Sequence, residues 1–527
     1  MTLDRGPIDR LMERADALAG AWGARARAST TIGQERAVLR LFGISGVDAH
    51  DRPLAGATVD RWLAADPAAL GGGIALPFAM ALLEYDLEPQ QLALDVAAGT
   101  IDLVLEAELL HDADRRAVAQ AEARRLAVAA TERIDAQRTV RREILGMLGD
   151  ADRPWLGATL REPDVDDAIE EAASYIAAGV DVIRVEVPIG RELADRMTDA
   201  GIAVPAWHPQ QRNPSVSPEA VDPAPTGSQR ALVRLREAID RSAARRGSYV
   251  RLVTAPPALG SPEGAVVAVF ERIDIVASNP MTEIVVGSVE PERSLADHAF
   301  MHRLVRRAGV SIHVGPGPLV VAPDLSAGQP SDPATRAGRA LALQLLSVAL
   351  AWSDGLTPEQ ILVGALPQWL TEESSAGARG LAEVVVRRRL FPDHQFVFTE
   401  PPRAGDPLGI WPFIQAAAAV RAGTIGMVMR TFDPSPASPL AARSVRAASR
   451  VTADVAAATT ASELTGVAAD HARAMVEAAL LTLERIGDLG WHTVAGDGPG
   501  EARPGSIRRD VAVERTESFD PFEPERA

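Results

Sequence analysis

The sequence contains no lysine and no cysteine, so its 54 basic side chains are all arginines. A pyridoxal phosphate enzyme that works alone needs a lysine amine to hold its cofactor covalently. An iron–sulfur site needs cysteine thiolates, and thiol catalysis and disulfides need cysteine as well. The abundance of Ala, Arg, Asp and Gly is typical of GC-rich coding, which explains the missing lysine without any function. Whatever the cause, this chain cannot build either cofactor site by itself.

Long uncharged apolar runs are missing too. No stretch of about 18 such residues occurs, and the first residues, MTLDRGPIDRLMERAD, are charged where a signal peptide is apolar. We therefore expect a cytoplasmic protein with no membrane partner. A net charge of −17 argues against nucleic-acid binding, because such proteins concentrate positive charge.

The 527 residues predict more than one structural unit, since a single domain rarely reaches that length. Apolar residues at helical spacing predict an N-terminal helical region over 1–150. Short β-rich runs then alternate with amphipathic segments over 151–435. A C-terminal helical extension is expected over 436–495, and a flexible Gly/Pro-rich tail over 496–527.

The β-rich runs decide the predicted fold class, α/β. Eight of them separated by helical segments match the count of a (β/α)8 TIM barrel. A doubly wound open sheet with eight strands is the alternative. The eight runs cover 155–160, 180–187, 249–255, 273–278, 310–315, 361–366, 395–400 and 425–431.

In a TIM barrel, chemistry takes place where strands end and helices begin. Arginines at such positions could clamp a phosphate or carboxylate, or could form salt bridges with neighbouring acids. His313 points either to the barrel mouth or to an interior hydrogen bond. The Pro-rich segment 201–226 is either an active-site lid or a disordered insertion. The strand-end candidates are Thr159, Arg161, Glu186, Gly190, Arg191, Thr254, Ser278, Asn279, His313, Gly315, Glu400, Arg403 and Arg430.

Two motifs imitate cofactor or metal sites. Residues 48–53, DAHDRP, resemble the cobalamin-ligating pattern Asp-x-His-x-x-Gly, but Pro53 replaces the glycine and no Rossmann strand precedes it. His298 and His302 have a spacing that can chelate a metal on a helix. No third ligand accompanies them, so we expect a solvated helix face and no metal site.

Several segments resemble the lysine 5,6-aminomutase alpha-subunit family, which is related to the ornithine 4,5-aminomutase large chain. The strongest is TTIGQERAVLRLFGISGVD, over 30–48. The resemblance runs in order through nearly the whole chain, which identifies it as a divergent member. The other matching segments are 87–103, 177–187, 247–256, 270–279, 387–402 and 519–525.

This resemblance implies a TIM barrel with helical additions that works with a smaller subunit. In the family, that partner supplies a Rossmann-type domain that binds adenosylcobalamin, and the lysine that holds pyridoxal phosphate. A lysine-free chain is therefore compatible with a shared site in a hetero-oligomer.

The family's cofactor ligands are largely replaced here. Val187 stands at the position of a family arginine, and Glu192, at the position of a phosphate-binding serine, would repel a phosphate. Only Gly190 matches in this stretch. Further positions with a family ligand fall near Pro257, Thr282, Gly315-Pro316-Gly317 and Arg403-Ala404, and only Arg403 could keep its charge. Pyridoxal phosphate binding is therefore doubtful, since each lost charged hydrogen bond costs about 1.5–3 kcal/mol.

The resulting hypothesis is an isomerase subunit of an adenosylcobalamin-dependent mutase that catalyses a 1,2-rearrangement of a small molecule. The candidate catalytic residues are Glu186, His313, Glu400 and Arg403, and the candidate cofactor-binding residues are Gly190, Arg191, Thr254, Asn279 and Gly315. The alternative is a catalytically silent paralogue that serves a cobalamin complex as a regulatory module. A barrel isomerase that works alone is disfavoured by the missing lysine and metal triad.

Overall fold

The computed structural model describes residues 5–50, 52–160, 164–186, 229–256, 259–285, 289–316, 332–365, 376–400, 425–430, 466–490, 512–516 and 519–522. At its centre, eight parallel strands close into a barrel in the order β2 to β9. This confirms the predicted TIM barrel with helical additions and excludes the open sheet. The strands are β2 Trp155–Thr159, β3 Val182–Glu186, β4 Arg251–Ala255, β5 Ile275–Ala277, β6 Ser311–Val314, β7 Ile361–Ala365, β8 Gln395–Glu400 and β9 Ile425–Arg430.

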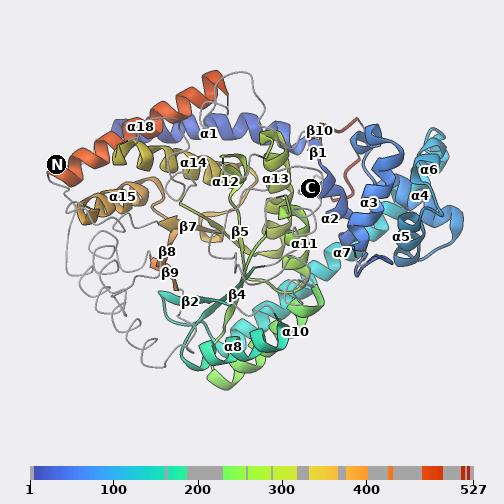
Figure 1. Cartoon of the computed structure of the whole chain (residues 1–527), viewed down its shortest axis with the longest axis horizontal. Helices are drawn as coiled ribbons and strands as arrows, with labels where there is room; N and C mark the ends of the chain where they lie inside the picture. The colour runs from blue at the N-terminus through green and yellow to red at the C-terminus, as the bar shows by residue number, and fades with distance from the viewer. Residues whose placement is uncertain are drawn as a thin grey trace.

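The described helices that follow the barrel strands cover the outside of the barrel (Figure 1). They bury an almost continuous apolar surface against the outward-facing strand residues. A C-terminal helix, α18 Val467–Leu489, packs on two of them, α14 and α15. The covering helices are α8 Val165–Ala177, α10 Gln229–Arg246, α11 Ser261–Phe270, α12 Pro280–Val285, α13 Pro291–Ala308, α14 Pro333–Ser353 and α15 Ala376–Leu390.

The described N-terminal part is mainly helical, as its periodicity predicts, with one two-residue strand, β1 Ser29–Thr30. The first helix, α1 Arg5–Arg27, packs on α13, α14 and α18, so it belongs with the covering helices of the barrel. Figure 1 shows α2 to α6 as a lobe to one side of the barrel. These helices are α2 Ile32–Leu41, α3 Leu54–Ala65, α4 Ala75–Tyr85, α5 Pro89–Ala98 and α6 Leu103–Leu109.

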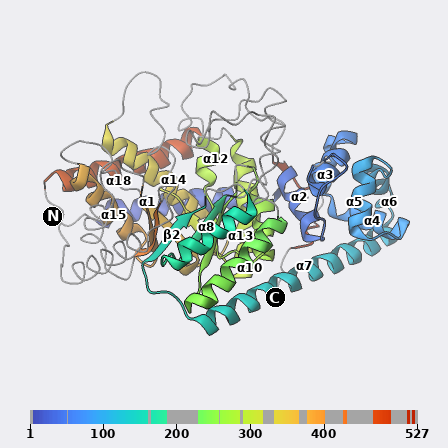
Figure 2. The same ribbon diagram turned by 60° about the horizontal axis from the view of Figure 1, so that its bottom comes forward.

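A 36-residue helix, α7 Ala113–Leu148, runs from this lobe along the barrel to the start of β2 (Figure 2). Its Arg141 Nη2 donates to the carbonyl oxygens of Ala308 and Gly309, over 2.5 and 2.8 Å. These carbonyls end α13 and would otherwise lack donors. The long helix therefore caps a barrel helix while it connects the two parts. No helix in the described part of the chain has the length and apolarity needed to cross a membrane.

Apolar side chains fill the barrel interior on the amino-terminal side of its mouth. Strand alternation turns one set of apolar residues inward, where they pack together as a cluster distinct from the outer core. The barrel is thus a packed interior and not a pore. The inward cluster consists of Trp155, Val182, Val253, Ile275, Leu362, Val397, Met427 and Met429.

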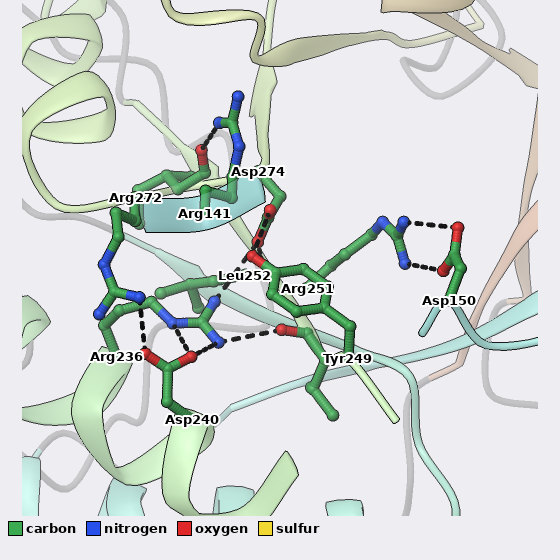
Figure 3. Close-up of polar contacts among 11 residues, drawn as sticks. Arg141, Asp150, Arg236, Asp240, Tyr249, Arg251, Leu252, Arg272 and Asp274 are labelled. Atoms are coloured by element: carbon green, nitrogen blue, oxygen red, sulfur yellow. Dashed lines mark hydrogen bonds and ion pairs between the residues drawn. The ribbon is translucent and has the colours of Figure 1, made fainter. Parts of the chain in front are cut away.

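The amino-terminal end of the barrel is closed by an arginine–carboxylate network (Figure 3). Asp274 accepts hydrogen bonds from Tyr249 Oη, over 2.8 Å, and from the backbone nitrogen of Leu252, over 2.9 Å, and pairs with Arg236. Burial and the charge of Asp274 raise the pKa of the Tyr249 hydroxyl. Arg251 lies 3.6 Å above the centre of the Trp155 ring. This end of the barrel serves stability, as is usual for the fold.

The chain boundaries proposed near 435 and 495 lie outside the described residues, as does segment 201–226. The division into units therefore stays a prediction.

Candidate functional site

The mouth of the barrel is the end where the carboxyl ends of the strands meet. Closure of the barrel brings three predicted residues to this end: Thr159 ends β2, Ser278 directly follows β5, and His313 lies near the end of β6. Glu186, Glu400 and Arg430 end β3, β8 and β9, and their side chains lie outside the described structure. Arg161, Gly190, Arg191 and Arg403 also lie outside the described residues.

The ends of β5 and β6 are joined by Asn279 and Gly315. Asn279 Oδ1 accepts a hydrogen bond from the Gly315 backbone nitrogen over 2.6 Å. A Cβ atom at Gly315 would lie 2.8 Å from the same oxygen, closer than real Cβ contacts come. Two candidate cofactor residues thus come together, and a glycine is required between them because the side chain of Asn279 already fills the space.

Gln344 of α14 ties β6 to β7 from behind the mouth. Its Nε2 donates to the carbonyl oxygens of Gly315 over 2.9 Å and Gly364 over 2.6 Å. Its Oε1 accepts from Arg387 Nε over 2.9 Å. Both Nε2 hydrogens donate and Oε1 accepts, so the orientation of this buried amide is fixed.

Arg387 is in turn held by Glu383, one turn earlier on α15. The two side chains are fully buried, and Arg387 Nη1 lies 3.2 Å from Glu383 Oε2. Burial lowers the pKa of Arg387, and the carboxylate of Glu383 opposes that shift. His471 of α18 completes the series, with Nε2 3.6 Å from Glu383 Oε1. Four buried side chains therefore lead from the C-terminal helix to the mouth.

His313 lies on the inward face of β6. Ile312 and Val314, its neighbours, belong to the outer core, so alternation turns His313 into the barrel. Its Nε2 is enclosed and has no hydrogen-bond partner in the described structure. Burial, reinforced by the charge of Arg184 on β3, lowers the pKa of His313 to about 3. The ring is neutral at physiological pH, with a polar atom available inside the barrel.

Thr254, another candidate, has a different environment. Val253 belongs to the inward cluster and Leu252 to the outer core, so alternation places Thr254 on the outward face of β4. The residue is 2% exposed, and its Oγ1 has no hydrogen-bond partner in the described structure. This threonine faces the covering helices and not the barrel interior.

Ser278, His302 and Asp354 form a buried hydrogen-bond chain. Ser278 Oγ lies 3.0 Å from His302 Nε2, and His302 Nδ1 lies 2.8 Å from Asp354 Oδ2. Asp354 also pairs with Arg27 of α1 over 2.9 Å. The order matches that of a hydrolytic triad, but Ser278 is only 1% exposed and no substrate can reach it. The chain anchors the end of β5 to α1.

The expectation that His298 and His302 occupy a solvated helix face is wrong. Both residues are buried, because α13 is covered by α1, α2, α7 and α11 as well as by the barrel. His298 Nδ1 lies 2.9 Å from the Ser294 carbonyl oxygen, and burial together with His302 lowers the pKa of His298 to about 4. In the described residues, no group of three or more His, Asp or Glu side chains could hold a metal ion.

The segment 30–48, which carries the strongest family resemblance, packs on the helices behind the mouth. Thr31 caps α2, accepting from the Gln34 nitrogen over 3.0 Å, and its hydroxyl also donates to Asp297 of α13. Gln34 Nε2 donates to the Ala296 carbonyl oxygen over 2.8 Å. Arg40 pairs with Glu263 of α11 over 2.7 Å. The segment's polar residues thus fix the position of the two helices that follow β4 and β5.

Gln344 and Arg387 were not among the predicted site residues. Gln344 interrupts the apolar run ALALQLLSVAL, and a lone amide in such a run is a signal for a buried, fully bonded side chain. Arg387 gives no comparable signal, because it stands first of three arginines at the end of a helix.

The residues described at the mouth do not fit pyridoxal phosphate. Of the positions aligned with family ligands, only Thr282, Gly315 and Pro316 lie in the described part, and none offers an aromatic ring or a charge. Asn279 already occupies the Gly315 nitrogen and the space beside it.

The fold and the residues at the mouth together define a (β/α)8-barrel protein with its candidate site at the carboxyl ends of the strands. Residues 1–203 and 225–406 match the family model for the D-lysine 5,6-aminomutase TIM-barrel domain of the alpha subunit. The chain belongs to this family.

Two curated relatives agree with that assignment. The lysine 5,6-aminomutase alpha subunit of Acetoanaerobium sticklandii is 25% identical over 406 residues, which are 76% of this chain and 71% of the relative. The Fusobacterium nucleatum subunit is 24% identical over 402 residues, covering 76% and 72%. A solved dihydropteroate synthase from Anaplasma phagocytophilum shares 14% identity over 56% of this chain and 98% of its own, with a TM-score of 0.35. That structural likeness adds nothing to the assignment.

Proposed function

We propose that this chain is the barrel subunit of a heteromeric, adenosylcobalamin-dependent isomerase that catalyses a 1,2-rearrangement of a small molecule. The family match over most of the chain carries the proposal. A Rossmann-type partner subunit would hold the cobalamin, which supplies radical chemistry when bound. The cytoplasmic location expected from the sequence stays a prediction.

The described residues support a shielding and positioning role for the barrel. The packed apolar interior below the mouth and the hydrogen-bonded ends of β5, β6 and β7 would help to keep water from reactive species. His313 Nε2 offers a neutral hydrogen-bonding atom inside the barrel. Glu186, Glu400 and Arg403 remain candidate catalytic residues, and Gly190, Arg191, Asn279 and Gly315 remain candidate cofactor-binding residues, whereas Thr254 faces the covering helices.

The reaction we propose does not use pyridoxal phosphate. The residues around Gly315, which offer no aromatic ring or charge and leave no space beside Asn279, support this departure from what the family resemblance implies. The same replacements favour the second candidate function, a silent paralogue that only binds or regulates a cobalamin complex.

Co-expression with the protein encoded by the neighbouring reading frame tests the proposal. We expect the purified complex to show a cobalamin absorption spectrum without the band of lysine-bound pyridoxal phosphate. Turnover of D-lysine or ornithine that depends on added pyridoxal phosphate would contradict the proposal. A cobalamin-bound complex that isomerises none of a panel of amino and hydroxy acids would support the silent paralogue instead.

A further inference from the structure

Glu283 joins the chain segments that follow β4 and β5. It lies on α12, directly after β5, and is 8% exposed. Its Oε1 lies 3.1 Å from the hydroxyl of Ser261, which begins α11 after β4. Its Oε2 lies 2.8 Å from the hydroxyl of Ser294 in the first turn of α13. One carboxyl group therefore holds two neighbouring connections at the mouth.

The hydrogen-bond count around Ser294 indicates where the protons are. The Ser294 hydroxyl has one hydrogen but two acceptors within reach, Glu283 Oε2 and the Pro280 carbonyl oxygen at 3.2 Å. If Glu283 is protonated, Oε2–H donates to Ser294 Oγ, and Ser294 donates to Pro280. Ser261 then donates to Oε1. Only the protonated acid satisfies all three contacts together.

Arg293 favours an ionised Glu283, but its charge is already shared with another buried acid. Arg293 and Asp297 of α13 form a buried ion pair over 2.6 Å, so an ionised Glu283 would add a second buried acid beside one arginine. His298 Nδ1 lies 3.8 Å from Oε2.

The other helices packed on this region supply no closer counter-charge in the described structure. Glu263 of α11 is already paired with Arg40 of α2. Burial raises the pKa of Glu283 to about 7, against the opposing effect of Ser294, Ser261 and Arg293.

We propose that Glu283 is a positioning residue of the barrel mouth, held as a neutral carboxylic acid whose proton links the connection after β4 to the one after β5. The inference rests on the proposed function only in taking the mouth as the place of chemistry. Raising the pH through neutrality removes the proton, reverses the hydrogen bond to Ser294 and releases the contact from Ser294 to Pro280, and it leaves a buried charge between the two connections. Burial is an established way to raise the pKa of a carboxylic acid so that it can donate a hydrogen bond.

The variants Glu283→Gln and Glu283→Ala test this in the full-length chain. The Gln amide keeps an acceptor for Ser261 and a donor for Ser294, so it mimics the protonated acid at every pH. Glu237→Gln is the matched control, because Glu237 is exposed on α10 and faces Arg241 at 3.9 Å. The infrared difference between wild type and Glu283→Gln should show a protonated carboxylic acid band at pH 6 that disappears above pH 8.

Stability provides the second measurement. The folded-state pKa of Glu283 lies above its ordinary value, so its contribution is fully present below pH 4.5 and is lost as the pH rises through about 7. The folding constant of wild type relative to Glu283→Gln should fall roughly 10- to 100-fold between pH 5 and 8, and the control pair should show no change. Hydrogen exchange of peptides containing Ser261 and Ser294 should accelerate in Glu283→Ala but not in Glu283→Gln.

Either of two results would overturn the inference: only ionised carboxylate bands between pH 5 and 8, or a Glu283→Gln variant that exchanges as fast as Glu283→Ala. These measurements need neither the partner nor cobalamin. Failure of the proposed isomerase activity would leave them unchanged, so the two failures can be told apart.

Discussion

Asn279 Oδ1 lies 2.6 Å from the backbone nitrogen of Gly315 and leaves no space for a side chain there. Replacing Gly315 with alanine should therefore cost about 1–3 kcal/mol of unfolding free energy, the range for overpacking a dense site. Chemical denaturation measures the change. Gly20→Ala is the control, because no atom lies within 4 Å of the added Cβ on α1, and it should be neutral or slightly stabilising.

A double variant shows whether the crowding at Gly315 comes from Asn279. If it does, adding Asn279→Ala to Gly315→Ala should recover part of the loss, giving an interaction energy of about 0.5–3 kcal/mol in the double-mutant cycle. Additive losses would mean that the backbone at Gly315, and not Asn279, sets the requirement for glycine.

Gln344→Leu should weaken the mouth more than its change in size suggests. Two carbonyl oxygens and one arginine nitrogen lose their partner, and each unsatisfied buried group costs about 1–3 kcal/mol. Thermal unfolding and hydrogen exchange at the ends of β6 and β7 measure this. Gln91→Leu, which removes an exposed amide contact to Asp95, should change stability by no more than about 0.5 kcal/mol. Equal effects in both variants would refute the role given to Gln344.

His313 should make the protein lose stability in acid. Its folded-state pKa of about 3 lies below the ordinary 6.5, so the unfolded chain binds more protons between these values. Stability then rises with pH across that window and is lost as the pH falls, by up to about 1.4 kcal/mol per pH unit. His313→Gln should flatten the profile between pH 6 and 4, and the exposed His111→Gln should not. An unchanged profile in His313→Gln would contradict a neutral, buried imidazole.

Asp274→Asn should destabilise the closed end of the barrel without changing the mouth. The substitution weakens the hydrogen bonds from Tyr249 and Leu252 and removes one of the two carboxylates paired with Arg236, which keeps its ion pair with Asp240, so we expect a loss of about 1–3 kcal/mol. Denaturation should show the loss, with the titration of Glu283 unaffected. Asp166→Asn, which removes an exposed ion pair to Arg234, is the control, with an expected change below about 1 kcal/mol.

The barrel could be predicted from the sequence because its signal is local. All eight β-rich runs became strands, since short apolar segments between helical ones have few other ways to be buried. The burial of His302 could not be predicted, because α1 and α2, which cover α13, are distant in sequence. Asn279 and Gly315 were predicted as separate candidates, and only the parallel register of β5 and β6 places them together.

The site was harder to predict because many of its polar residues lie on helices and act through other side chains. Gln344 and Arg387 lie on helices behind the strands, where position relative to a strand end gives no indication. Glu283 follows β5 closely, but its sequence context is that of an ordinary helical glutamate. Only the fold brings the hydroxyls of Ser261 and Ser294 to it. Such convergence depends on tertiary packing.

The packing of α1 against α14 and α18 has a consequence for biosynthesis. Figure 1 shows the first and last long helices of the chain side by side. During translation, α1 emerges first but meets α18 only after more than 400 intervening residues have left the ribosome. Until then its apolar stripe is a surface that chaperones can bind, and a ribosome that stalls before Val467 would release a chain whose first helix never finds this partner.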